Sequence, residues 1–268
     1  MSPVAIAVAG ALGRMGRALT TRILNNPDFR LVGGSLRPDH PDLEKDLGQV
    51  LGLGTKGVLA TADLAVALKE AKVLVDFTTP SALEGHLLAA EKAGVAVVVG
   101  TTGLGDLERA ALKRAAKTIP VLWGPNMSLG VNLLYKLVDL ATRSLGSDFD
   151  LEIVEAHHKG KKDAPSGTAL ELAKILTSLR GLDAEKDLTF GRSGQLGPRS
   201  AREVGVLALR GGDVVGEHTV YFCGLGERLE LTHRAQSRET FVSGALRAAL
   251  WLADKPQGFY SIKDVLGV

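Results

Sequence analysis

The sequence predicts an α/β protein in which a doubly wound parallel sheet is followed by a second α+β domain with a mixed or antiparallel sheet. An apolar run at Val4–Ala9 opens the chain and leads directly into a glycine turn. Strand and helix patterns then alternate with short connections up to residue 123, which favours parallel strands. Beyond residue 200, polar and apolar residues alternate between glycine turns, and this pattern favours a mixed or antiparallel sheet.

The first domain is predicted from five apolar runs and the helical patterns between them. Continuous apolar runs are typical of strands buried on both faces of a parallel sheet. The strands are expected at residues 4–9, 30–35, 72–77, 95–99 and 120–123. The helices are expected after the glycine turn up to residue 24 and at residues 61–70, 80–92 and 107–117. Residues 38–60 are rich in glycine, proline and charge, and we expect a surface excursion there.

The second domain is predicted to begin with a long amphipathic helix at residues 129–145. Its strands are expected at residues 150–156, 202–209, 214–222 and 228–234, with a helix from residue 168 and a mobile loop at 183–199. A last helix at residues 240–253 has an apolar face suited to the first sheet. We therefore expect a first domain of residues 1–126 completed by 239–268, and a second domain of residues 127–238.

Composition excludes several classes of protein. Thirty-two basic and 30 acidic residues give a net charge of +2, which argues against general nucleic-acid binding. The single cysteine, Cys223, excludes an intramolecular disulfide and argues against a cysteine-ligated metal site. The chain shows neither a signal peptide nor an apolar run of about 20 residues, so we expect a cytoplasmic protein without a membrane partner.

The glycine turn after the first strand has the context of a dinucleotide-binding fingerprint, which indicates a Rossmann-type domain. Gly10 would allow the tight turn, Gly13 would let the backbone approach a pyrophosphate, and Gly16 would let the helix pack on the strand. Glycines at a strand–helix turn can also serve geometry alone, but the position directly after a buried N-terminal strand favours a cofactor site.

The end of the second strand suggests which cofactor is used. NAD-specific domains place an acidic residue here to bind the ribose hydroxyls, whereas this chain has Leu36 followed by Arg37. A guanidinium group can pair with a 2′-phosphate through charge-assisted hydrogen bonds. Arg37 therefore favours NADPH over NADH.

Three further loops follow strands of the first sheet, at residues 77–80, 100–103 and 124–127. Ligands of doubly wound sheets bind beyond the carboxyl ends of the strands. We therefore expect these loops to contact the ribose and nicotinamide of the cofactor, although each is also compatible with turn chemistry alone.

The segment 155–168 combines two histidines, three lysines, an aspartate and a Pro-Ser-Gly-Thr turn. Ser166 or Thr168 is a plausible N-cap for the helix that follows. A helix N-terminus presents backbone N–H groups and suits an anion. Since side chains alternate along a strand, His157 and His158 are expected to point in different directions. The segment predicts a site for a small anionic substrate that must be protonated; the alternative is a solvated lysine-rich loop.

Three of these motifs together resemble the dihydrodipicolinate reductase (4-hydroxy-tetrahydrodipicolinate reductase) family. They are the glycine turn at residues 8–17, the Gly-Thr-Thr-Gly loop at 100–103, and the segment 155–170. The resemblance extends to residues 211–218 and 226–230 and thus covers nearly the whole chain. It implies NAD(P)H-dependent reduction of a cyclic dicarboxylate in lysine and diaminopimelate biosynthesis, with hydride transfer to ring carbon C4 followed by protonation.

The resemblance also implies roles for individual residues. His157 would be the proton donor or acceptor and Lys161 the proton donor, and a histidine with a pKa near ~6.5 suits such a role. His158 and the amides of Gly167 and Thr168 would bind the substrate carboxylates. The cofactor contacts carried over are Gly10, Ala11, Leu12, Gly13, Arg14, Met15, Arg37, Gly100, Thr101, Thr102, Gly124, Pro125, Asn126 and Met127.

Members of this family typically form homotetramers through their second-domain sheets, so the resemblance implies a homotetramer. The chain departs from some relatives at two positions. Leu36 stands where an acidic residue can precede the arginine, and Thr79 stands where relatives can carry arginine. The first departure agrees with NADPH as the preferred cofactor and NADH as the alternative.

Two rival functions remain open from the sequence. A semialdehyde dehydrogenase would need an activated cysteine, and Cys223 lies in an apolar strand pattern. A non-catalytic nucleotide-sensing protein could use the same fold, but it has no need for His157 and Lys161.

Overall fold

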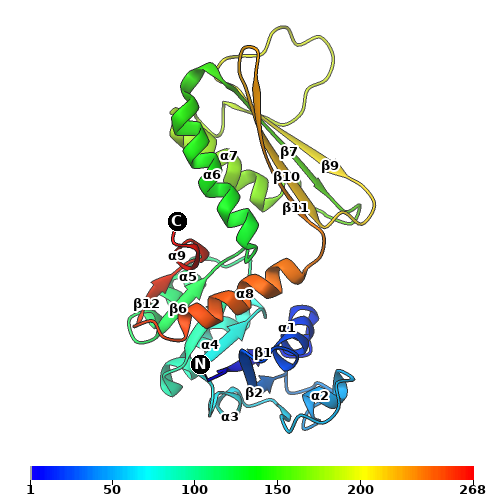
Figure 1. The fold of residues 1–268 in the computed structure, drawn as a ribbon, viewed down its shortest axis with the longest axis vertical. Helices are drawn as coiled ribbons and strands as arrows, with labels where there is room; N and C mark the ends of the chain where they lie inside the picture. Colours follow the sequence, from blue (N-terminus) through cyan, green and yellow to red (C-terminus); the bar gives the residue numbers. More distant parts are fainter. Residues whose placement is uncertain (1) are drawn as a thin grey trace. The chain divides into compact units, whose positions relative to one another are not determined.

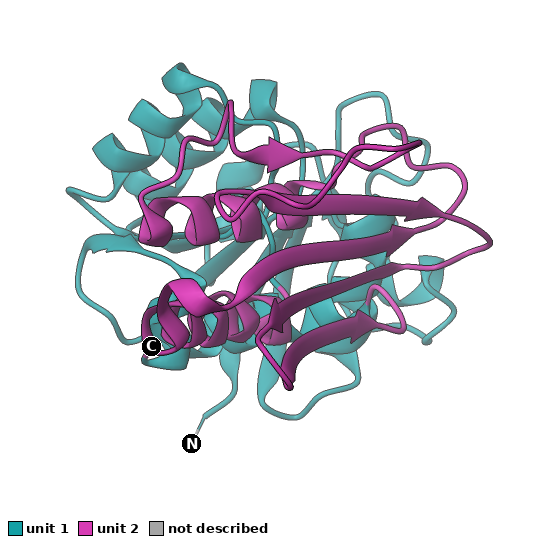
Figure 2. Cartoon of the chain, turned by 90° about the horizontal axis from the view of Figure 1, so that it is seen from above, with its two compact units in different colours: residues 1–127, 239–267 teal, residues 128–238, 268 magenta. Residues whose placement is uncertain are grey.

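The computed structural model describes residues 2–268 and divides into two compact units, shown in separate colours in Figure 2. Unit 1 comprises the chain up to Met127 together with Glu239–Gly267. Unit 2 comprises Ser128–Arg238 and Val268. Each unit contains its own sheet.

The sheet of unit 1 has seven strands, and every neighbouring pair is parallel. The strand order is β12-β6-β5-β4-β1-β2-β3. The bounds are β1 Val4–Ala9, β2 Phe29–Ser35, β3 Ala60–Thr61, β4 Val73–Asp76, β5 Ala96–Val99, β6 Pro120–Trp123 and β12 Gly258–Tyr260. The predicted doubly wound parallel sheet is confirmed, and its order reverses between β1 and β4, where such sheets bind ligands.

Helices cover both faces of this sheet. Their bounds are α1 Arg14–Leu24, α2 Leu47–Val50, α3 Leu64–Leu68, α4 Pro80–Ala93, α5 Asp106–Ala115, α8 Glu239–Leu252 and α9 Ile262–Leu266. Helices α3, α4 and α5 share one buried apolar cluster with the sheet, including Leu83, Leu87, Leu112 and Val97. Helices α1 and α8 pack together, and α8 also contacts β4, β5 and β6. The last part of the chain therefore helps to build the core of unit 1.

Unit 2 has a mixed five-stranded sheet in the order β11-β10-β7-β9-β8, as the sequence predicts for the second domain. The bounds are α6 Leu129–Leu145, η1 Gly146–Asp148, β7 Asp150–His157, α7 Gly167–Arg180, β8 Leu188–Thr189, β9 Val204–Arg210, β10 Gly216–Cys223 and β11 Arg228–Ala235. Strand β7 is antiparallel to β10 and parallel to β9. Helices α6 and α7 cover one face (Figure 1), and their side chains join Ile153, Val220 and Phe222 in the core.

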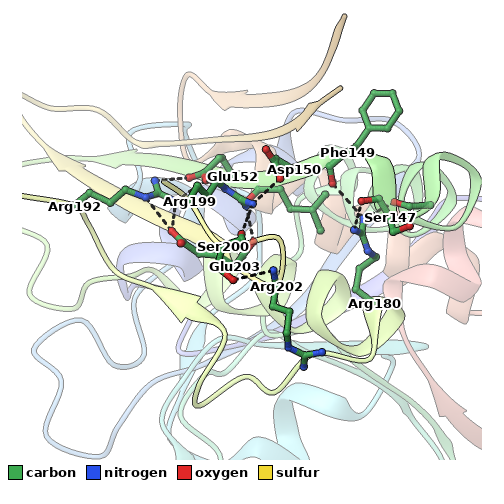
Figure 3. A network of polar contacts seen from close by, with 12 residues as sticks. Ser147, Phe149, Asp150, Glu152, Arg180, Arg192, Arg199, Ser200, Arg202 and Glu203 are labelled. Carbon is green, nitrogen blue, oxygen red and sulfur yellow. Dashed lines mark hydrogen bonds and ion pairs between the residues drawn. The ribbon is translucent and has the colours of Figure 1, made fainter. Parts of the chain in front are cut away.

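Residues 183–203 are mostly irregular, and arginines tie this segment to the sheet (Figure 3). Arg192 donates hydrogen bonds to Glu152 at 2.7 and 3.0 Å and also pairs with Glu203. Arg199 pairs with Glu152 at 3.0 Å and with Asp150 at 2.7 Å. The pairs with Asp150 and Glu152 anchor the irregular segment on β7, and the pair with Glu203 joins two parts of the segment itself.

The elements that the sequence analysis did not predict are all short: α2, β3, η1, β8, β12 and α9. Each has two to five residues, too few for an apolar period to emerge. Across residues 2–268, the helices are too short or too polar to cross a bilayer.

Candidate functional site

The glycine turn of unit 1 has the geometry that its sequence requires. Gly10 has a φ of +64°, a conformation that glycine adopts without strain. Gly13 is the N-cap of α1 and supplies no side chain to the first turn of that helix. A Cβ at Gly16 would lie 1.9 Å from the backbone oxygen of Gly10, so only glycine lets α1 pack this closely. The turn thus leaves backbone at a helix N-terminus open to an anion.

A cavity of about 610 Å³ adjoins the glycine turn. It is lined by Gly10, Leu12, Gly13, Ser35, Leu36, Arg37, Pro38, His40, Ala62, Leu64, Thr78, Thr79, Ala82 and His86. Four of the predicted cofactor residues are in this set, together with two threonines of the loop at residues 77–80. The volume and the mainly apolar lining suit a nucleoside.

The other predicted residues of the turn, Ala11, Arg14 and Met15, are not among the residues that line this cavity. Ala11 is buried, and its N–H donates to the oxygen of Ser35 at 3.0 Å, which joins the turn to β2. Arg14 is exposed and Met15 half-buried in the first turn of α1. Arg37 is exposed, and its Nε lies 3.1 Å from Asp39 Oδ1. A phosphate group would therefore compete with Asp39 for this guanidinium.

A buried carboxylate at the end of β4 organises the cavity wall. Asp76 is fully buried and accepts hydrogen bonds from the N–H and the hydroxyl of Thr78, at 2.8 and 2.6 Å. Its second oxygen lies 2.8 Å from Nδ1 of His86 on α4. The sequence analysis missed His86. The available signal was a histidine on the helix predicted directly after a strand that ends in an aspartate.

The two remaining cofactor loops, at residues 100–102 and 124–127, follow the neighbouring strands β5 and β6. The Gly100 N–H donates to the backbone oxygen of Asp76 at 2.8 Å, and the Gly124 N–H donates to the backbone oxygen of Val99 at 3.0 Å. Gly100, Thr101, Gly124 and Met127 are buried, Asn126 is half-buried, and Thr102 and Pro125 are exposed. The hydroxyl of Thr101 is buried without a hydrogen-bond partner among residues 2–268. A bound amide or ribose group would satisfy that hydroxyl, so these residues fit a dinucleotide.

In unit 2, the loop after β7 is held against the turn between β9 and β10. The Gly211 N–H donates to the oxygen of His157 at 3.0 Å, and the Lys159 N–H donates to that of Gly212 at 3.2 Å. Within the loop, the Lys161 N–H donates to the oxygen of His158 at 3.1 Å. The two predicted catalytic residues are therefore close together in the chain: His157 is the last residue of β7, and Lys161 lies on the short loop that follows it.

His157, at the end of β7, is the titratable group next to this loop with the most contacts described. Its side chain is 12% exposed, and its Nδ1 lies 2.5 Å from Oε2 of the buried Glu155. Burial lowers the pKa of His157, as do the charges of Lys161 and Arg210, and together they outweigh the hydrogen bond and charge of Glu155. With Nδ1 held by a carboxylate, the other ring nitrogen of such a histidine can transfer a proton.

Helix α7 begins beside this histidine. Ser166 is the N-cap, and its hydroxyl accepts a hydrogen bond from the Ala169 N–H at 3.2 Å. Gly167 is exposed, with open space around its Cα, and Thr168 is half-buried. His158 is half-buried and lies beside Gly160. The predicted carboxylate-binding residues are thus part of the loop or of the helix N-terminus that follows it, which is suited to anions.

Lys161, the second predicted catalytic residue, forms an ion pair on the same loop. Its Nζ lies 2.9 Å from Oδ1 of Asp163, and its side chain is 20% exposed. The hydrogen bond from Lys161 lowers the pKa of Asp163. An anion that binds at Lys161 would therefore compete with Asp163 for the ammonium group.

Three residues that sequence reasoning missed complete this part of unit 2: Glu155, Arg210 and His218. His218 is 4% exposed, and its Nε2 lies 3.1 Å from the Ser166 hydroxyl. Burial, with the nearby charge of His157, lowers the pKa of His218 to about 4, so this imidazole is neutral at pH 7. The signal for Glu155 was present, because a glutamate two residues before His157 in an alternating strand shares its face.

Comparison with known proteins places these features in one family. The family model described as "Dihydrodipicolinate reductase, N-terminus" matches residues 4–127, and the one described as "Dihydrodipicolinate reductase, C-terminus" matches residues 130–266. The 4-hydroxy-tetrahydrodipicolinate reductase of Myxococcus xanthus is 49% identical over 97% of this chain and 96% of the relative. That of Alkalilimnicola ehrlichii is 47% identical over 98% of both chains.

Solved structures show the same architecture. A dipicolinate-bound dihydrodipicolinate reductase from Paenisporosarcina sp. TG-14 superimposes with a TM-score of 0.75 at 23% identity, covering 97% of each chain. GenD2 from gentamicin A biosynthesis, in complex with NAD, gives a TM-score of 0.58 at 15% identity and covers 99% of this chain and 91% of its own. At these identities the likeness concerns the fold alone.

Proposed function

Because the chain belongs to the dihydrodipicolinate reductase family, we propose that it reduces 4-hydroxy-tetrahydrodipicolinate to tetrahydrodipicolinate at the expense of NAD(P)H. The reaction adds a hydride at ring carbon C4 and a proton, and the 4-hydroxyl leaves as water. The observation that carries the proposal is the segment of unit 2 from the end of β7 to the start of α7, where His157, Lys161 and a helix N-terminus occur together. In this role the chain serves lysine and diaminopimelate biosynthesis.

Unit 1 is the proposed cofactor-binding domain. The turn from Gly10 to Met15 holds the pyrophosphate, the cavity beside it receives the adenosine, and the loops at 100–102 and 124–127 receive the nicotinamide half. The bound nucleotide supplies the hydride. NADPH is the preferred cofactor in this proposal, because Arg37 is exposed at the cavity and no acidic residue occupies position 36.

Unit 2 is the proposed substrate-binding and catalytic domain. Two carboxylates need two anion sites, and His158 with the Gly167 and Thr168 amides supplies them. Lys161 donates a proton to the substrate, and His157 donates or accepts one through Nε2, since Nδ1 is engaged by Glu155.

The rival function as a semialdehyde dehydrogenase is disfavoured by the position of its cysteine. Cys223 and Gly216 are at opposite ends of β10, and Gly216 adjoins His157. The seven steps along the strand from Gly216 to Cys223, at about 3.3 Å each, place the thiol about 23 Å from the end of the sheet that carries His157. A nucleotide-sensing protein is disfavoured because it would have no use for a solvent-accessible lysine beside a histidine–carboxylate pair.

We further propose a cytoplasmic homotetramer. The face of the unit 2 sheet opposite α6 and α7 carries Thr219, Tyr221 and Thr232, and the edge strand β11 is largely exposed. Pairing of these sheets between copies would bury that face. Light scattering tests this assembly, with an expected mass four times the 28.2 kDa of one chain; the mass of a single chain would contradict it.

The activity is tested by adding the condensation product of aspartate semialdehyde and pyruvate to the purified protein with NADPH. We expect the reduced nicotinamide to be consumed in a one-to-one ratio with tetrahydrodipicolinate formed. Lys161→Ala provides the matched control. It removes one proposed proton donor from a loop and leaves the sheet unchanged, so we expect turnover to fall in this variant while the fold is kept. Absence of turnover with both NADPH and NADH would refute the proposal.

A further inference from the structure

Glu155 is a fully buried glutamate in the middle strand of the unit 2 sheet, and each of its oxygens has two partners. Arg210 on β9 donates to both oxygens, at 2.8 and 2.9 Å. Oε2 also lies 2.5 Å from Nδ1 of His157, and Oε1 accepts the Ser166 N–H at 3.1 Å. One carboxylate therefore contacts both the proposed proton-transfer residue and the N-cap of α7.

The contacts of this carboxylate contribute more to the geometry of the proposed site than to the stability of the fold. A buried ion pair gives little net stabilisation, because desolvation of both charges offsets their attraction. Its geometry, however, fixes the His157 ring, since a carboxylate at Nδ1 requires a proton there and leaves Nε2 as the reactive nitrogen. A Cβ at Gly216 would lie 3.0 Å from that Nε2, so glycine keeps space beside it.

We propose that Glu155, held by Arg210, is a positioning residue that fixes the tautomer and orientation of His157 and seats the first turn of α7. The proposal rests on the proposed function, in which His157 moves a proton and the start of α7 binds a carboxylate. Glu155 acts through these groups and itself contacts neither substrate nor cofactor.

The charges around His157 determine how its titration responds to substitution. Glu155 on β7 favours the protonated ring, while Arg210 on β9 and Lys161 on the loop oppose it. His218 on β10 has its ring centroid 5.2 Å from that of His157 and is neutral above pH 4, and Asp163 partly neutralises Lys161. Removing Glu155 and removing Arg210 should thus move the pKa of His157 in opposite directions.

The test compares steady-state pH profiles of the full-length protein and two variants. In Glu155→Gln, we expect the limb that reports His157 to move to lower pH, with kcat reduced about 10- to 100-fold at neutral pH. The change in KM should be small, because the amide oxygen of glutamine can still accept the Ser166 N–H and hold the first turn of α7. In Arg210→Gln, we expect the same limb to move to higher pH. The direction is the same whether His157 serves as acid or as base, because both limbs follow its pKa.

Glu152→Gln is the matched control. Glu152 lies on the same strand and pairs with two arginines, but it is three residues away and on the other face of the sheet. This variant should keep the kcat and pH profile of the wild type. A profile that moves equally in Glu152→Gln and Glu155→Gln would show a general effect of removing charge from the sheet and would overturn the proposal.

A measurement on the wild type decides the question even if Glu155→Gln fails to fold. Long-range ¹H–¹⁵N NMR spectra of histidine-labelled protein distinguish the two neutral tautomers, and the His157 signals are assigned with His157→Asn. We expect His157 to carry its proton on Nδ1. A proton on Nε2, or unchanged pH profiles in both variants of an active enzyme, would overturn the proposal. If the wild type lacks reductase activity, the proposed function fails instead, and the tautomer still tests the positioning.

Discussion

The neutral buried imidazole of His218 should make the stability of the protein depend on pH in a defined window. Its pKa is about 4 in the folded chain, against an ordinary value of 6.5 that applies when the chain unfolds. Between these values the unfolded state binds the proton and the folded state does not, so the free energy of unfolding falls as pH decreases from 6.5 to 4. The difference between these two pKa values corresponds to about 3 kcal/mol of unfolding free energy.

Urea unfolding at a series of pH values and at constant protein concentration measures this contribution. His157 and Glu155 also titrate in acid, so the informative quantity is the difference between the wild type and His218→Gln. We expect this difference to be constant above about pH 7 and to change by about 3 kcal/mol as pH falls to 4. Parallel curves for the two proteins throughout this range would refute the assignment of a neutral, buried His218.

Three further predictions concern activity and cofactor use. His157→Ala and Lys161→Ala should each lower turnover by about 10²-fold or more, as expected for general acid–base residues, and near-normal turnover in either would contradict that residue's role. Arg37→Ala should lower the catalytic efficiency with NADPH more than with NADH, and an unchanged ratio of the two efficiencies would remove the 2′-phosphate assignment. In Gly216→Ala, the new Cβ would lie 3.0 Å from Nε2 of His157. We therefore expect a lower kcat with unchanged NADPH affinity in this variant. A kcat equal to that of the wild type would contradict the idea that Nε2 of His157 needs free space beside it.

Local chemistry made much of unit 1 predictable. The turn from Gly10 to Gly16 was recognisable because each glycine meets a local steric demand of the strand–turn–helix unit. Buried parallel strands such as Val4–Ala9 can likewise be predicted from their continuous apolar runs. Elements such as β12 and α9 were not predicted, because short segments are defined by tertiary pairing, here with β6 and α8.

The candidate site was predictable only where its residues are neighbours in sequence. His157, His158 and Lys161 are close neighbours in the sequence, whereas Arg210 comes 55 residues after Glu155, and His218 comes 52 residues after Ser166. Their contacts depend on the register of β7 with β9 and β10, which hydrophobic alternation alone does not fix. The sequence therefore placed Glu155 at the start of a motif, but its contact with Arg210 could be identified only in the folded sheet.

Hydride transfer from the nicotinamide to the substrate ring is the central claim, and isotope labelling tests it most directly. The reaction is run with NADPH deuterated at C4 on one face and, separately, on the other, and the product is analysed by mass spectrometry and NMR. We predict one deuterium atom at ring carbon C4 of tetrahydrodipicolinate from one of the two labelled cofactors and none from the other. Product that carries no deuterium from either cofactor would contradict the account.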